Sequence, residues 1–118
     1  MANLGLQGYV SEVEPDELEH LETLFDTTWG AHLEHWRVRD LPDMVQSLGG
    51  DGTNYVWFQF GLHVLAKRLW RTAGATGFTR LVEVLRGPER SQDELVAVLR
   101  TLDERVADAV SDWPYFDF

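Results

Sequence analysis

The stretch that decides the fold is residues 55–71, which read YVWFQFGLHVLAKRLWR. Apolar side chains are so dense there that a helix through these residues would be apolar on most of its faces, which is typical of a helix in the middle of a fold. The apolar run is broken by Gln59, Gly61 and His63 and is too short to span a bilayer. Aromatic and β-branched residues also favour strands, so a short strand at 55–60 is the alternative. We predict a central helix.

The residues before this stretch predict a long helix, a turn and a short helix. Ser11 and Glu14 have the spacing of a capping box and Pro15 suits a first helical turn, so we expect a helix from near residue 15 to about residue 36. Apolar residues recur within it at three- and four-residue steps. Residues 40–43 then predict a turn into a short helix, which ends at a glycine-rich loop, residues 49–52.

The residues after the central stretch predict two further helices. Gly74 and Gly77 separate the central helix from a helix over 78–85. Ser91 and Glu94 form a second capping box, and the helix that begins there shows the clearest amphipathic pattern in the chain. Its apolar residues recur on one face without a break: Leu95, Leu99, Leu102, Val106, Ala109 and Val110.

Composition supports one folded domain that spans residues 1–118. Apolar residues make up 44% and aromatic residues 12% of the chain, above the range in which a polypeptide stays disordered. The absence of cysteine excludes a disulfide framework and a cysteine-type zinc site, and it favours a reducing compartment. No basic segment precedes an apolar run at the N-terminus, so secretion is not expected. We predict an all-α fold, a compact bundle of four to five helices, in a soluble, cytoplasmic monomer or homodimer.

The chain is strongly acidic, and its charge is unevenly placed. The net charge is −10; residues 1–54 hold eleven acids and two bases, whereas residues 55–90 hold two acids and six bases. A surface this negative repels nucleic-acid phosphate and attracts basic protein surfaces, so we expect a basic protein partner and no direct contact with nucleic acid or membrane. Lys67, Arg68 and Arg71 are expected to pair with acids elsewhere in the fold, with a small anion site as the alternative.

The predicted partner surface has two parts. These are the acidic residues on the first and last predicted helices and the aromatic residues within 113–118. Large rings rimmed by charge are typical of interfaces, although these rings could equally fold back onto the protein's own core or a twin subunit. The leading hypothesis is a non-catalytic binding protein, such as an immunity protein, an antitoxin or another inhibitor of a nucleic-acid-handling protein. Its predicted partner contacts are Glu17, Glu19, Asp26, Asp112, Trp113 and Phe116.

A small helical metal-binding protein or metalloenzyme is the alternative function. Glu17 and His20 have the Glu-x-x-His spacing of two-metal helix bundles, but only one complete copy is present. His32 and His35 add a His-x-x-His pair that could complete a mononuclear site. The competing interpretation is that His20, His32 and His35 lie on a solvated acidic face of the protein. In that interpretation His63 is a core histidine with a hydrogen-bond partner. We predict no catalytic residue and no cofactor, since the chain has no cysteine and no Gly-x-Ser-x-Gly turn.

Overall fold

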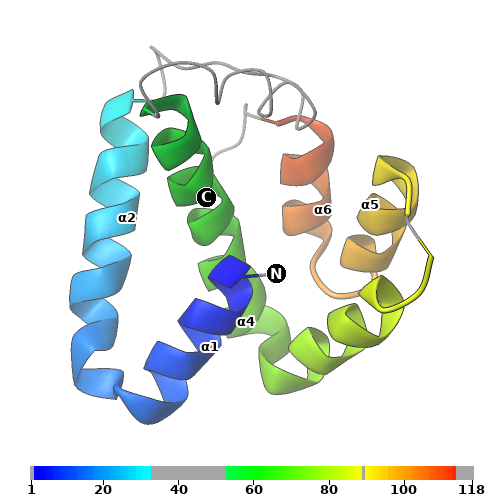
Figure 1. Cartoon of the computed structure of the whole chain (residues 1–118), viewed down its shortest axis with the longest axis horizontal. Helices are drawn as coiled ribbons and strands as arrows, with labels where there is room; N and C mark the ends of the chain where they lie inside the picture. The colour runs from blue at the N-terminus through cyan, green and yellow to red at the C-terminus, as the bar shows by residue number, and fades with distance from the viewer. Residues whose placement is uncertain (1, 33–52, 89, 114–118) are drawn as a thin grey trace.

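The computed structural model describes residues 2–32, 53–88 and 90–113, and in these residues it is all-helical (Figure 1). The elements in chain order are α1 (Ala2–Val13), the 3-10 helix η1 (Pro15–Glu17), α2 (Leu18–His32), α4 (Thr53–Leu85), α5 (Gln92–Arg100) and α6 (Glu104–Ser111). The predicted all-α bundle is therefore confirmed. The alternative strand at 55–60 is wrong, because α4 covers these residues. The predicted turn at 40–43 and the glycine-rich loop at 49–52 lie outside the described residues.

The long helix α4 organises the fold. Gly74 has φ 55° and ψ −154° inside it, so α4 bends there and its two parts run in different directions (Figure 1). Glycine adopts this left-handed conformation without the steric cost that a Cβ would bring. Gly77, in contrast, is buried within the second part and does not interrupt it. The predicted separation of two helices is confirmed at Gly74 and wrong at Gly77.

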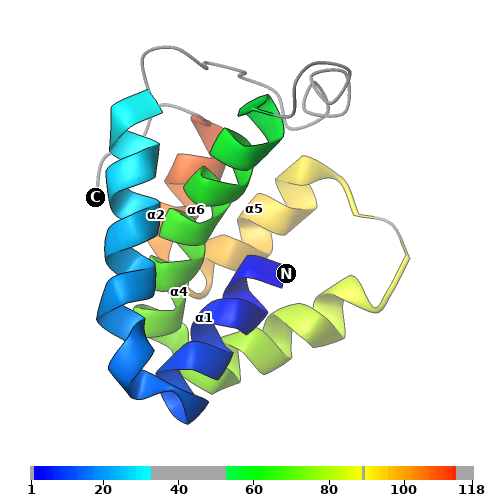
Figure 2. The same ribbon diagram turned by 60° about the vertical axis from the view of Figure 1, so that its left-hand side comes forward.

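The other helices pack on the two sides of α4. α1 and α2 lie along it, and α5 packs against α6 on the opposite side, with α6 next to α4 (Figure 2). None of the helices in the described part of the chain is long and apolar enough to cross a membrane.

The first predicted capping box falls at the C-terminal end of a helix, α1, and not at the start of one. Ser11 lies in its last turn, and the Ser11 hydroxyl donates to the carbonyl oxygen of Gln7 at 2.7 Å. The Glu14 carboxylate instead accepts a hydrogen bond from the Tyr9 hydroxyl at 3.1 Å. The capping box at Ser11 and Glu14 is therefore wrong. The helix predicted from residue 15 is confirmed as η1 followed by α2, up to His32.

The sequence patterns did not predict α1 because its buried side is not a stripe of large apolar residues. Gly8 brings α1 so close to α4 that a Cβ at this position would lie 2.6 Å from atoms of the Trp70 ring. A glycine in the middle of a helix usually costs stability, so in the sequence alone Gly8 indicates the end of a helix. Only the close approach of α1 to Trp70 explains why a glycine is favourable there. The buried residues of α1 are Leu4, Gln7, Gly8 and Val10.

The single C-terminal helix predicted from the apolar periodicity is two helices. The predicted capping box at the start of α5 is confirmed: the Ser91 hydroxyl accepts from the Glu94 backbone N–H at 3.3 Å, and the Ser91 N–H donates to the Glu94 carboxylate at 2.9 Å. However, α5 ends at Arg100 and α6 begins at Glu104. The prediction of an unbroken helix here is wrong.

Asp103 accounts for the break. Its buried carboxylate accepts from the Val106 backbone N–H at 3.1 Å, which caps α6, and from the Thr72 hydroxyl at 2.9 Å. The Arg68 Nε lies 3.1 Å from the same carboxylate. Burial by itself would raise the pKa of Asp103, but these three partners lower it. Leu99 and Val106 are both buried across the break, so the apolar spacing continues through it and could not reveal it.

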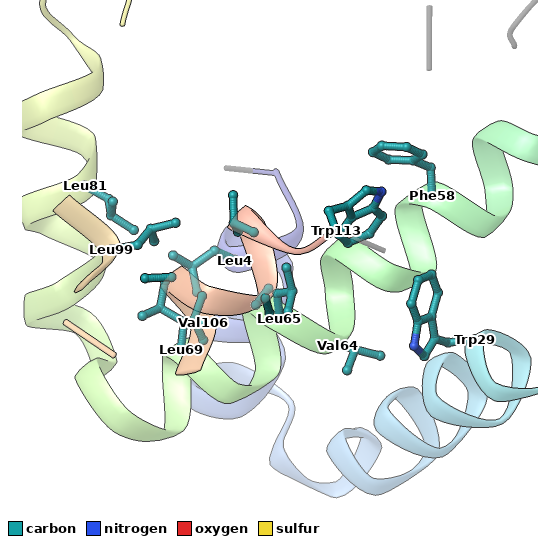
Figure 3. Close-up of a cluster of buried hydrophobic side chains, with 14 residues drawn as sticks. Leu4, Trp29, Phe58, Val64, Leu65, Leu69, Leu81, Leu99, Val106 and Trp113 are labelled. Carbon is teal, nitrogen blue, oxygen red and sulfur yellow. The ribbon is translucent and has the colours of Figure 1, made fainter. Parts of the chain in front are cut away.

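One end of the core is built from aromatic rings, and we call it the aromatic end (Figure 3). The Trp113 ring lies 4.8 Å from the Phe58 ring and 5.5 Å from the Trp29 ring, measured between centroids. Gly61 lies against these rings: a Cβ there would be 2.5 Å from Trp113 and would also press on Trp29. Trp113 is 2% exposed, so this ring of the C-terminal aromatic group folds onto the protein's own core.

The other end of the core, which we call the aliphatic end, consists of leucine and valine side chains from four helices (Figure 3). Its members face one another where α1, both parts of α4, α5 and α6 meet. They are Leu4, Leu65, Leu69, Leu81, Leu99 and Val106.

Candidate partner-binding surface

Exposed acids gather where the chain turns from α1 into α2. Pro15 starts η1 at this turn, and acids in the first turn of a helix are stabilised by its dipole. All five acids are exposed, and none forms an ion pair with a base in the described ranges. We call this group the acidic corner: Glu12, Glu14, Asp16, Glu17 and Glu19.

Exposed apolar side chains on α1 adjoin the acidic corner. Leu6, Tyr9 and Val13 are 40%, 52% and 60% exposed, and their spacing of three and four residues places them on one face of the helix. We call this face the α1 stripe. The Tyr9 hydroxyl donates to the Glu14 carboxylate at 3.1 Å, which links the stripe to the corner. This hydrogen bond and the charge of Glu14 raise the pKa of Tyr9.

The residues predicted to contact a partner do not form one surface. Glu17 and Glu19 lie in the acidic corner, whereas Asp26 forms an ion pair with Lys67 of α4. Asp112 is exposed at the end of α6, which lies far from the start of α2 in both views (Figures 1 and 2). Trp113 is in the core. Phe116 lies outside the described residues.

The predicted ion pairs of the basic cluster in α4 are confirmed. Lys67 pairs with Asp26 and Arg71 pairs with Glu22, both across the seam between α2 and α4. Glu22 is 9% exposed and also accepts from the Gln7 Nε2 at 2.7 Å, so α1, α2 and α4 meet at this carboxylate. A shallow groove along the seam is lined by Pro15, Leu18, Glu19, Glu22, Thr23, Asp26, Lys67 and Arg71. Its three acids oppose the small anion that was the alternative ligand of the basic cluster.

His63 lies in the core beneath this seam. It is fully buried and its ring stacks on Phe25 with the centroids 3.9 Å apart, but neither ring nitrogen has a hydrogen-bond partner in the structure as described. Burial lowers the pKa of His63 to about 4 and Lys67 adds to this, while the carboxylates of Glu22 and Asp26 oppose it. The prediction of a core histidine is confirmed, and the prediction of a hydrogen-bond partner is wrong.

The alternative metal site gains no support from the described residues. Glu17 and His20 are both exposed on the outside of the bundle, and no three potential metal ligands come together in residues 2–32, 53–88 and 90–113. The side chain of His32 and the whole of His35 lie outside the described part.

Sequence reasoning found the acids of the corner but missed the α1 stripe beside them. The spacing of Leu6, Tyr9 and Val13 was visible, but it indicates a common face only once these residues are known to be helical. Comparison of the chain with protein-family models, with curated proteins and with solved structures finds no match. The function is therefore argued from this surface.

Proposed function

We propose that this chain is a cytoplasmic, non-catalytic binding protein that presents the acidic corner and the α1 stripe to a basic surface of a partner protein. The observation that carries the proposal is that exposed acids, which form no ion pair within residues 2–32, 53–88 and 90–113, lie directly beside exposed apolar side chains. Apolar anchors next to charged groups are the arrangement of specific protein interfaces.

Electrostatics supports a basic partner. The bases Lys67, Arg68 and Arg71 are paired with acids, so they do not offset the field of the corner, where five carboxylates lie within eight residues. Such a field speeds the encounter with a basic surface and repels an acidic one. A nucleic-acid-handling protein has a basic surface of this kind, so an immunity protein, an antitoxin or another inhibitor of such a protein fits the chemistry.

A matched pair of charge reversals tests the role of the corner. Glu17→Lys lies in the corner and Glu83→Lys lies on the second part of α4; both side chains are exposed, and each reversal adds two units to the net charge of −10. Glu17→Lys should weaken partner binding at low salt about tenfold or more, because it places a like charge against the basic surface. Glu83→Lys should leave binding almost unchanged, since only the overall charge differs.

The partner is identified by tagged capture from nuclease-treated host lysate and is then purified for titration against both variants. Binding that weakens with salt and with Glu17→Lys, but not with Glu83→Lys, supports the proposal. Equal effects of the two reversals, or binding that is independent of salt, contradict it.

A second pair of variants tests the α1 stripe. Val13→Ser removes an apolar side chain that is 60% exposed, and Leu24→Ser removes one that is 51% exposed on α2. Both variants should fold normally because little buried area is lost. Val13→Ser alone should weaken binding of the purified partner, mainly through faster dissociation. Equal affinities of the two variants would show that the stripe is not an anchor.

A further inference from the structure

The aliphatic end of the core is not filled. A cavity of about 170 Å³ lies among its side chains, on the opposite side of α1 and α4 from α2. Apart from Asn3, all of its lining residues are aliphatic, and they come from α1, both parts of α4, α5 and α6. The lining residues are Asn3, Leu4, Leu62, Leu65, Ala66, Leu69, Leu81, Leu85, Leu95, Leu99, Val106 and Val110.

The cavity has an entrance and one polar group. Leu85 is 37% exposed, so the cavity reaches solvent where the second part of α4 ends. Asn3 is partly buried, and its Nδ2 donates to the Gln59 Oε1 at 2.9 Å. This bond orients the Asn3 amide and leaves its Oδ1 able to accept a hydrogen bond from a ligand hydroxyl. None of the described residues that line the cavity is charged.

We propose that this cavity is a binding site for a neutral, apolar ligand group of about six to eight carbon atoms. An apolar cavity of about 150 Å³ lined by aliphatic and aromatic side chains stays free of water and takes up benzene, so this volume and lining suit a group of that size. A carboxylate is disfavoured beside Asn3, because the Nδ2 of this amide already donates to Gln59 and no cation among the described lining residues offsets the cost of burying the charge. The ligand is a free small hydrocarbon or the end of a neutral amphiphile whose hydroxyl meets Asn3.

Titration of the whole chain with three probes tests the site. Benzene represents the free hydrocarbon, 1-hexanol represents the end of a neutral amphiphile, and hexanoate is the charged control of equal chain length. Methyl groups of leucine and valine are followed by NMR with carbon-13 labels. Benzene, 1-hexanol or both should cause saturable shifts at Leu65, Leu69 and Leu99, while hexanoate should bind more weakly than the neutral probes that bind. Val64 is buried but does not line the cavity, so its methyl groups should not move (Figure 3).

Competition and a blocking variant complete the test. Where both neutral probes bind, excess benzene should reverse the shifts caused by 1-hexanol. Ala66→Leu fills the cavity from α4 and should abolish the shifts, whereas Ala97→Leu, on the exposed face of α5, should leave them unchanged. The proposal is overturned if neither neutral probe gives saturable shifts at the lining methyl groups, if hexanoate binds as tightly as 1-hexanol, or if a folded Ala66→Leu variant binds as the unmodified chain does.

Discussion

The aromatic and aliphatic ends of the core share the helix α4 but differ in how completely side chains fill them. At the aromatic end, the rings of Trp29 and Trp113 come so close to α4 that no Cβ fits at Gly61. At the aliphatic end, side chains from four helices meet around a cavity of about 170 Å³. Each aromatic ring buries a large area, so the three rings pack the aromatic end closely, whereas the smaller leucine and valine side chains leave a void at the aliphatic end.

Because one end of the core is filled and the other contains a void, we expect the aromatic end to be rigid and the aliphatic end to be adaptable. A filled region resists both loss and gain of volume, whereas a region with a void tolerates added volume and gives room to a ligand. The bend at Gly74 contributes to the void at the aliphatic end, because it directs the second part of α4 away from the first (Figure 1).

The largest effect is expected from removing a ring at the aromatic end. Phe58 is fully buried, so Phe58→Ala should lower the free energy of unfolding by about 3–5 kcal/mol. Leu24→Ala, at a side chain that is 51% exposed, should lower it by less than about 1 kcal/mol. Urea unfolding of both variants measures the difference. Similar values for the two would mean that the aromatic end is not closely packed.

A second prediction concerns pH, because the core buries the ring of His63. His63 has a pKa of about 4 in the folded protein against an ordinary value of 6.5. Above pH 6.5 both states are neutral; between pH 6.5 and 4 the unfolded state binds a proton that the folded state does not, so stability falls as pH falls. Below about pH 4 both states are protonated. His63 should therefore remove about 3 kcal/mol of stability over this window.

Two leucine variants separate this effect from other titrations. His63→Leu should flatten the decrease in unfolding free energy between pH 6.5 and 4, and it should also remove the cost of two unpaired ring nitrogens. His20→Leu, at an exposed histidine, should keep the decrease of the unmodified protein. Equal slopes for the two variants in urea titrations at several pH values would exclude the proposed role of His63.

A third prediction adds one methyl group to each of two helical glycines. Gly61→Ala should lower the unfolding free energy by about 1–3 kcal/mol, because the new Cβ overlaps the rings of Trp29 and Trp113. Gly5→Ala meets no atom within 4 Å and should raise it by up to about 1 kcal/mol through better helix propensity. Thermal unfolding followed by circular dichroism compares them. A stabilising Gly61→Ala would show that the aromatic end has spare room.

Some of this architecture could be predicted from the sequence because local patterns determine it. The density of apolar residues in 55–71 predicted the central helix, and Ser91 with Glu94 predicted the start of α5. The element that was missed, α1, depends on the close approach of Gly8 to Trp70, which involves residues 62 positions apart. Contacts of this kind leave no periodic signal.

The candidate surface could likewise be predicted only in part. Charge alone placed Glu17 and Glu19 on the outside, because unpaired carboxylates are seldom buried. Trp113 was expected at a partner surface or in the core with equal weight, and only tertiary packing against Phe58 decided for the core. The break at Asp103 depends on contacts with Thr72 and Arg68 of α4, which are close in space but remote in the sequence, so the local pattern could not show it.

The smallest effect is expected where volume is added at the aliphatic end. Ala66 lines the cavity, so Ala66→Leu should change the unfolding free energy by less than about 1 kcal/mol, since the new side chain enters space that is already present. Ala107 is equally small and fully buried on α6 but does not line the cavity, and Ala107→Leu should cost about 1–3 kcal/mol. Urea unfolding of the two variants measures the difference: equal destabilisation would mean that Ala66→Leu finds no spare volume, and the contrast between the two ends of the core would no longer hold.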